Sequence, residues 1–298
     1  MKAKSEREIT KAVLKNIWDC LKNIVEIVRT NSKLDEILIS TCEKLFRFCV
    51  DYKRKIEFKR FSENHRYFVN KILRNLVLYP DYLKTGNAVD ITDVTTNERY
   101  LSIFAQQMQT ALNLKLWQEA FKISEDMHSV MKVRKSILKP KFLSAYFENL
   151  AKVFWSSRYY LYHANAFYSH YVIYKKFSKA KTDEIQAKSN QLFLSILTIP
   201  PFAIENEQKD ENRLKISNLL SSSGALPQRG ELISILRNTN LLELVSPEIN
   251  ELFCLLEDEF NLLTFAKKAE VLFKQLEDNA NYKFYLEPIK QNLVLLIT

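Results

Sequence analysis

The sequence predicts an all-α fold, built as a right-handed solenoid of antiparallel helical hairpins. Only three glycines occur in 298 residues, whereas β-rich and doubly wound folds need many glycine turns and phosphate loops. The segment LWQEAFKISEDMHSV, which begins at Leu116, has an apolar arc that covers roughly half of the helix circumference. A helix with so wide an arc has neighbours on two sides, as in a stack of helical hairpins.

Helical periodicity and cap signals place the elements of the N-terminal part. Helices are expected at residues 6–30, 33–55, 56–78 and 94–113, followed by the helix that contains Trp117. Ser32 and Asp35 resemble a capping box that opens the second helix. Pro80 and Gly86 predict a loop between residues 79 and 93.

The C-terminal part shows the same pattern. Helices are expected at residues 140–156, 158–177, 182–197, 213–222, 229–239, 247–258, 261–277 and 282–297. Ser246 followed by Pro247 is a strong helix start. The segment 158–177 is apolar almost all round, which predicts a position deep inside a helical assembly. The last helix ends on bare apolar residues, which suggests that its packing partner lies outside this sequence.

Charge, cysteine pattern and hydropathy limit the cellular compartment and the kinds of partner that are expected. The net charge of +9 suits contact with nucleic acid or acidic partners. The four cysteines form no CxxC pair, and Cys42 and Cys49 are expected to be reduced, buried thiols of a cytosolic protein. The N-terminus lacks the apolar core of a signal peptide and no run of eighteen apolar residues occurs. A cytoplasmic protein without a membrane segment is therefore expected.

Several stretches resemble one known family. They are KLFRFCVDYKRKIEFKRF, WQEAFKISEDMH, KPKFLSAYFENLAKVFW, YHANAFY, LFLSILTIP and LVSPEINELFCLLEDEFNLLTFAKKAEVLF. Together they are similar to the N-terminal half of the A subunit of eukaryotic translation initiation factor 3, in consistent order from about residue 11 to residue 298.

This resemblance implies a TPR/PCI-like fold, with helical repeats at 1–112 and, at 113–298, repeats that lead into the helical part of a PCI module. The family's winged helix is absent, so the sequence resembles a middle fragment of a longer scaffold subunit. The implied function is a non-enzymatic scaffold without cofactors. It would bind other initiation factor 3 subunits, notably subunit c, and the rRNA and proteins of the small ribosomal subunit. Scaffold subunits of the proteasome lid or the signalosome share this architecture and are the alternative.

Positive charge is concentrated in windows at residues 51–74, 132–141 and 175–181. Clustered lysine and arginine is the pattern expected for phosphate contact, although for each window alone a solvated helix face or a loop flanking the core is the more common explanation. The candidate RNA or ribosome contacts are Lys53, Arg54, Lys55, Lys59, Arg60, Lys132, Arg134 and Lys135. His65 lies among these charges and is expected to be exposed.

Other patterns favour structural roles. The aromatic stripe Tyr160, Phe167, Tyr171 and Tyr174 could stack bases, but at helical spacing it is more often core. His163 and His170 lack a third ligand at matching spacing, so no metal site is expected, and His128 is expected in the core. No GxSxG, HExxH, P-loop or GxGxxG motif occurs, which argues against an enzyme.

Overall fold

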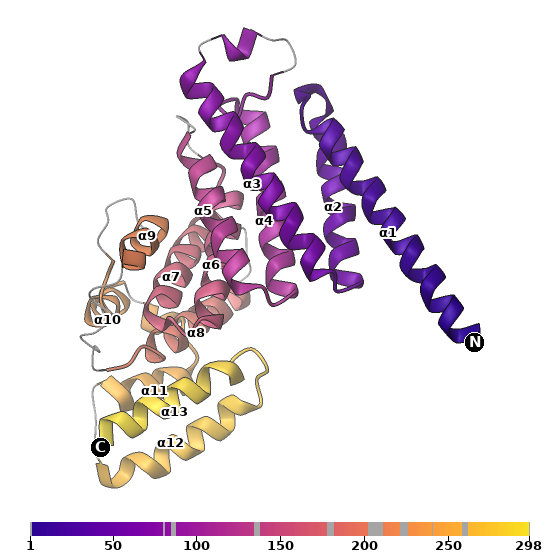
Figure 1. Ribbon diagram of the computed structural model, residues 1–298. Coiled ribbons are helices and arrows are strands. Elements are labelled where there is room, and N and C mark those ends of the chain that lie inside the picture. Colours follow the sequence, from indigo (N-terminus) through magenta and orange to yellow (C-terminus); the bar gives the residue numbers. More distant parts are fainter. Residues whose placement is uncertain are drawn as a thin grey trace. The chain divides into compact units, whose positions relative to one another are not determined.

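A computed structural model of the chain describes residues 2–79, 81–84, 88–133, 138–177, 182–201, 211–220, 226–239, 241–257 and 262–297 (Figure 1). These ranges contain thirteen α-helices and no strand. The chain packs as two compact units, residues 1–142 and 143–298. The division into helical repeats at 1–112 and a PCI module at 113–298 stays a prediction. The right-handed twist of the solenoid also stays a prediction.

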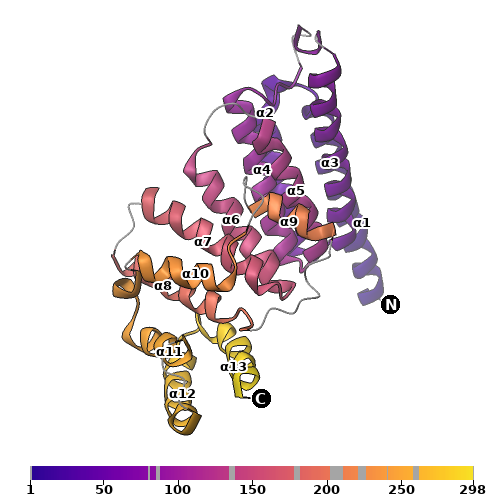
Figure 2. The same ribbon diagram turned by 90° about the vertical axis from the view of Figure 1, so that its left-hand side faces the viewer.

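The first unit holds five helices and two short 3-10 turns. They are α1 (Lys2–Val28), η1 (Ser32–Leu34), α2 (Asp35–Asp51), α3 (Lys55–Leu78), η2 (Tyr82–Lys84), α4 (Val94–Asn113) and α5 (Trp117–Val133). The helices α2, α4 and α5 pack side by side, and α3 lies against α5 (Figure 2). The core between them contains the fully buried side chains of Leu45, Phe58, Tyr100 and Phe104.

The second unit holds the remaining helices, except that the first three residues of the first one belong to the first unit. They are α6 (Pro140–Ser156), α7 (Tyr160–Phe177), α8 (Thr182–Leu197), α9 (Glu211–Leu220), α10 (Arg229–Asn238), η4 (Leu241–Leu244), α11 (Pro247–Glu257), α12 (Leu262–Glu277) and α13 (Lys283–Ile297). Helix α8 is central because α7, α10, α11 and α13 all pack against it. Its C-terminal half and the two residues that follow it are buried without interruption, from Leu192 to Ile199. Pro140 and Pro247 each open a helix as expected, whereas Pro288 lies inside α13.

Three hairpins, α2–α3, α4–α5 and α6–α7, share one turn geometry. The residue after the C-cap has a left-handed backbone, with φ of 52° at Lys53, 57° at Lys115 and 60° at Arg158. In the first turn the amide of Arg54 donates to the carbonyl of Cys49 (2.9 Å) and that of Lys53 to Val50 (3.2 Å), and the other turns repeat both bonds. This is the Schellman motif, in which glycine is the usual left-handed residue.

Buried ion pairs and polar side chains join the helices. Arg66 of α3 donates from Nε to Asp126 (2.6 Å) and from Nη2 to Glu119 (3.2 Å), both on α5. In the second unit, Asn292 of α13 donates to the carbonyls of Leu197 (3.0 Å) and Ile199 (3.2 Å) at the end of α8. Carbonyls at the end of a helix lack partners within it, so Asn292 supplies a donor to both groups and shares the carbonyl of Ile199 with Arg229.

Arg229 joins α10 to α11 and to the end of α8. Its Nη1 donates to Glu257 (3.2 Å), its Nη2 donates to the other carboxylate oxygen of Glu257, and its Nε donates to the carbonyl of Ile199 (3.2 Å). The side chains of Arg229 and Glu257 are only 21% and 12% exposed. Paired guanidinium and carboxylate groups in this forked geometry fix the relative orientation of the helices that carry them.

His163 of α7 is buried and neutral. Its Nδ1 lies 2.8 Å from the carbonyl of Ala151, which can only accept, so Nδ1 carries the proton and Nε2 accepts from the hydroxyl of Tyr285 (3.3 Å). Burial lowers the pKa of His163 to about 4. Since the folded pKa lies below the unfolded value, the unfolded state binds more protons between pH 6.5 and 4, and stability is lost as the pH falls through this window.

We expect His163 to reduce the free energy of unfolding by about 2 kcal/mol between pH 7 and pH 5. Urea denaturation of the parent chain and of His163→Gln at both pH values measures this difference. The variant starts less stable at pH 7 but should lose about 2 kcal/mol less on acidification. An equal loss in both proteins would mean that His163 does not stay neutral in the folded state.

Most expected helices are confirmed, with three local corrections. The expected capping box of Ser32 and Asp35 is wrong: Asn31 caps η1 by accepting from the amide of Lys33, and α2 begins at Asp35 without a side-chain cap. The expected exposure of His65 is also wrong, since its side chain is 8% exposed and packs against Tyr100 and Phe104.

The third correction concerns α7. Residues 163–167 of this helix are buried as expected, but Val172 and Phe177 at its C-terminal end are 44% and 56% exposed. The segment is therefore not enclosed on all sides. Within the described residues, no helix has the length and apolarity that a membrane span requires.

Helix α1 carries two parallel apolar stripes. Trp18, Val25 and Val28 are buried, and α1 packs on α2. A second stripe, one residue earlier in register, is exposed and consists of Val13, Ile17, Cys20, Ile24 and Ile27. Spacings of four and three residues place each stripe along one side of the helix.

Candidate functional site

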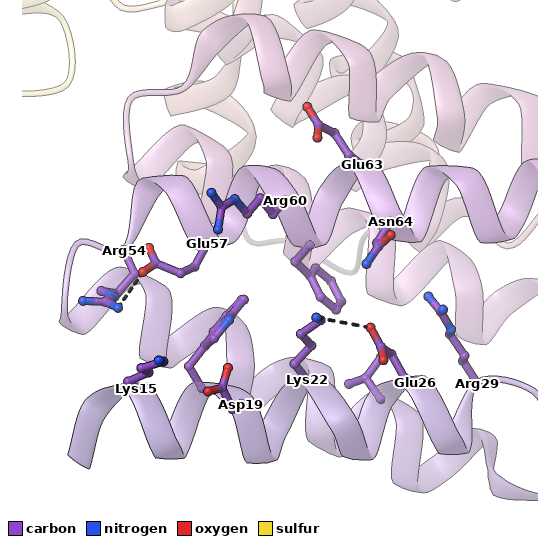
Figure 3. A pocket seen from close by; sticks show the side chains of 13 residues that line it. Lys15, Asp19, Lys22, Glu26, Arg29, Arg54, Glu57, Arg60, Glu63 and Asn64 are labelled. Carbon is purple, nitrogen blue, oxygen red and sulfur yellow. Dashed lines mark ion pairs between the residues drawn. The ribbon is translucent and has the colours of Figure 1, made fainter. Parts of the chain in front are cut away.

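A groove of about 770 Å³ runs between α1 and α3 in the first unit (Figure 3). Its apolar lining consists of Trp18, Val25 and Phe61. Its polar lining comprises Lys15, Asp19, Lys22, Glu26, Arg29, Arg54, Glu57, Arg60, Glu63 and Asn64. Figure 3 shows Arg54 and Lys15 toward one end of the groove and Asn64 and Arg29 toward the other. The groove thus combines apolar side chains with a charged rim.

The sequence of α1 builds one wall. Lys15, Lys22 and Arg29 are seven residues apart and therefore follow one side of the helix. Trp18 and Val25 lie next to this row and are buried. Three cations consequently line one wall at intervals of about 10 Å, given a rise of about 1.5 Å per residue.

The turn between α2 and α3 positions the other wall. Arg54 is the last residue of the Schellman motif, and its amide hydrogen bond to Cys49 fixes where its side chain leaves the backbone. Glu57, Arg60 and Asn64 follow at helical spacing on the same side of α3. Glu63 projects away from α1 (Figure 3).

Two ion pairs lie within the groove. Lys22 and Glu26 are 3.6 Å apart, and Arg54 and Glu57 are 2.5 Å apart. Both pairs join residues three or four positions apart in the sequence and are partly exposed, so each contributes only a few tenths of a kcal/mol to about 1 kcal/mol. Neither pair closes the groove, because each joins residues of the same wall.

Two guanidinium groups in the groove have unused hydrogen-bonding capacity. The Nε atoms of Arg29 and Arg54 are buried and have no hydrogen-bond partner among the described residues. The guanidinium of Arg29 lies 4.8 Å from the centre of the Phe68 ring. Buried donors without acceptors cost free energy, so both arginines favour an incoming acceptor.

The five basic residues between positions 53 and 60 that were predicted to contact RNA or the ribosome lie in two different environments. Arg54 and Arg60 line the groove. Lys53, Lys55 and Lys59 are exposed and do not line it. The five residues therefore do not form a single patch. Arg66, from the same basic window, turns inward to Asp126 and Glu119.

The other basic windows are only partly described. Lys132 is exposed at the end of α5, whereas Arg134 and Lys135 lie outside the described residues. Lys139 forms a 2.7 Å ion pair with Glu98. Lys175 and Lys176 are exposed at the end of α7, and Lys179 and Lys181 lie outside the described residues. These windows stay candidate contacts.

Sequence reasoning missed Lys15, Lys22 and Arg29. Their seven-residue spacing on the first expected helix was the available signal, but no run of adjacent cations marks these positions. What the sequence could not show is that α3 places Arg54 and Arg60 opposite this row.

The side chains considered for chemistry have structural environments. Phe167 and Tyr171 of the aromatic stripe are buried, and the hydroxyl of Tyr174 donates to Glu184 (3.0 Å). Burial raises the pKa of the Cys42 and Cys49 thiols to about 12, which leaves both unreactive near neutral pH. Across the described ranges, no three His, Cys, Asp or Glu side chains come together as metal ligands do.

Comparison with known proteins adds independent information. Residues 1–264 match the family model described as "eIF3a, PCI domain, TPR-like region". The chain is similar to the A subunit of eukaryotic translation initiation factor 3 from Arabidopsis thaliana, with 31% identity over 290 residues, 92% of this chain and 29% of the relative. It is 30% identical over 292 residues to the corresponding protein of Yarrowia lipolytica, 97% of this chain and 30% of the relative. The corresponding protein of Nicotiana tabacum is 29% identical over 290 residues, 92% of this chain and 30% of the relative. The chain thus spans less than a third of the length of these relatives.

Proposed function

The chain belongs to the family of the A subunit of eukaryotic translation initiation factor 3, and on this basis we propose that it is a non-enzymatic scaffold segment of the initiation factor 3 complex. It binds sister subunits through its helical surfaces and helps to dock the assembly on the small ribosomal subunit in the cytoplasm. The family match is the observation that carries this proposal. It favours initiation factor 3 over the proteasome lid and the signalosome.

The left-handed turn at Lys53 supports a contact role for basic residues. A non-glycine residue in this conformation costs on the order of 1 kcal/mol relative to glycine. The three turns of this geometry carry Lys53, Lys115 and Arg158 instead. Part of the cost is offset because cations are favourable near helix C-termini. An exposed cation at such a turn is also well placed to meet a phosphate.

We propose that Lys53, Lys55 and Lys59 contact ribosomal phosphates. The triple variant Lys53→Gly, Lys55→Glu and Lys59→Glu should bind isolated small ribosomal subunits at least about tenfold more weakly at low salt. Its affinity should also depend less steeply on salt, by about one unit of slope for each phosphate that the lysines no longer neutralise. Co-sedimentation with small subunits at several salt concentrations measures both quantities.

Two controls separate binding from folding. Lys53→Gly alone should leave the free energy of unfolding unchanged or slightly increased, because glycine adopts the left-handed conformation without strain. The double variant Lys267→Glu and Lys268→Glu on α12 makes a similar change of charge elsewhere and should bind like the parent chain. A triple variant that binds as tightly as the parent at every salt concentration would remove these lysines from the interface. Lys132, Arg134 and Lys135 are proposed as a second contact.

Sister subunits, notably subunit c, are the proposed protein partners. Co-purification of the chain with separately expressed initiation factor 3 subunits tests this part. Retention of subunit c after washing at high salt would support it, since contacts between packed helices depend less on salt than phosphate contacts do. Loss of every subunit under low-salt conditions would contradict it.

A further inference from the structure

We propose that the groove between α1 and α3 binds a short, extended, acidic segment of a partner protein that carries one apolar side chain near its middle. This inference does not rest on ribosome binding. It rests on the arrangement of the groove, in which the cations of two helices face one another over apolar side chains.

The dimensions of the groove favour a short peptide. Lys15 and Arg29 are fourteen residues apart on α1, which corresponds to about 21 Å along the helix axis. An extended chain at about 3.3 Å per residue covers this length with about six residues. The volume of about 770 Å³ lies in the range typical of pockets for small ligands rather than for whole helices.

The electrostatics favour carboxylates as ligands. Lys15, Arg29 and Arg60 line the groove without an ion pair to any described residue. The buried Nε atoms of Arg29 and Arg54 lie toward opposite ends of the groove and lack acceptors within the described structure. Carboxylates near the two ends of a bound peptide would satisfy these donors and form charge-assisted hydrogen bonds.

The groove also carries carboxylates of its own, which argues against a nucleic acid as its occupant. Asp19 lies between Lys15 and Lys22 along α1, whereas Glu26 pairs with Lys22 and Glu57 pairs with Arg54. A nucleic acid carries a charge at every phosphate and would bring several against these side chains. A peptide can place its acidic residues at the cations and its apolar side chain near Trp18 and Phe61.

Fluorescence anisotropy tests the proposal with a labelled hexapeptide that carries a carboxylate at each end, Glu-Asn-Leu-Gln-Asn-Glu, and the parent chain at low salt. The comparison probes are the hexapeptide Gln-Asn-Leu-Gln-Asn-Gln and a labelled uridine hexanucleotide. We expect the acidic peptide to bind with a Kd below about 1 mM. The uncharged peptide should bind at least about tenfold more weakly, because the cations then lose their ionic partners.

Matched variants locate the site. Arg60 lines the groove, whereas its neighbour Lys59 on α3 does not. The variant Arg60→Glu therefore tests the groove, and Lys59→Glu is its control. Lys15→Glu on α1 is matched in the same way by Lys44→Glu on α2, which is exposed outside the groove. The two groove variants should weaken binding of the acidic peptide about tenfold and their controls less than about twofold. Asp19→Lys should strengthen binding, a gain that a misfolded protein cannot produce.

Three outcomes would overturn the proposal. Absence of acidic-peptide binding up to about 1 mM would do so. Equal loss in Arg60→Glu and Lys59→Glu would show diffuse attraction to a basic surface. Tighter binding of the uridine hexanucleotide, with the same dependence on Lys15 and Arg60, would make the groove a nucleic-acid site. None of these results bears on whether Lys53, Lys55 and Lys59 contact the ribosome.

Discussion

Replacing Arg66 with methionine is expected to lower the free energy of unfolding by about 3 to 5 kcal/mol. Methionine fills much of the space of the arginine stem but removes the guanidinium from Asp126 and Glu119, whose side chains are 12% and 5% exposed. Two carboxylates would then remain buried without their cation. Urea denaturation at pH 7.5, followed by far-ultraviolet circular dichroism, measures the loss.

The deficit caused by Arg66→Met should shrink on acidification. Burial raises the pKa of Asp126 to about 6, and Arg66 counteracts this rise. Without the guanidinium, the folded pKa moves further above the unfolded value of 3.8. The folded state then binds more protons than the unfolded state as the pH falls through this window, so stability recovers. An equal loss of stability at pH 7.5 and pH 5 would mean that the loss comes from poorer packing and not from a buried carboxylate without its cation.

Two further proteins complete this test. Arg66→Met combined with Asp126→Asn should recover part of the stability at pH 7.5, because the buried charge is removed with its partner. Arg74→Met, on the exposed side of α3, should change the free energy of unfolding by less than about 0.5 kcal/mol. A large effect of the exposed substitution would mean that helix propensity, rather than the ion pairs, sets the result.

Arg229→Met is expected to have an effect of similar size in the second unit, about 3 to 5 kcal/mol. The substitution removes both guanidinium donors from the carboxylate of Glu257 and one of the two donors to the carbonyl of Ile199, which still accepts from Asn292. Thermal and urea denaturation of Arg229→Met, Glu257→Gln and the double variant form a double-mutant cycle. A coupling energy of about 1 to 3 kcal/mol between the two positions is expected.

The matched control for Arg229→Met is Lys267→Met, an exposed cation on α12. It should leave stability within about 0.5 kcal/mol of the parent chain. Strictly additive effects of Arg229→Met and Glu257→Gln would contradict the pairing, because residues that share a forked ion pair must couple.

The sequence was sufficient to predict the helices but not the environment of individual polar residues. Exposure of His65 is the natural expectation because Glu63, Asn64 and Arg66 surround it in the sequence. It lies, however, four residues after Phe61 and four before Val69, both buried, so helical spacing places it on the apolar side. Helical periodicity therefore predicts that His65 is buried, whereas the charged residues next to it in the sequence favour exposure.

Charge clusters were the least informative signal. Adjacent cations on a helix point about 100° apart, so the run from Lys53 to Arg60 separates into outward-facing lysines and groove-lining arginines. The carboxylates that draw Arg66 inward are more than fifty residues away on α5. Only tertiary packing, which local sequence does not encode, brings these partners together.

The attachment of α1 has a consequence for how long the groove persists. Helix α1 packs most extensively on α2, and the apolar stripe next to its buried side leaves Ile27 71% exposed. Helix α4, in contrast, packs on both α2 and α5. Elements with fewer packed neighbours open at lower free energy, so the amide protons of α1 should exchange with deuterium before those of α4. Each such opening removes one wall of the groove, and a ligand that contacts both walls would protect the amides of α1 against exchange.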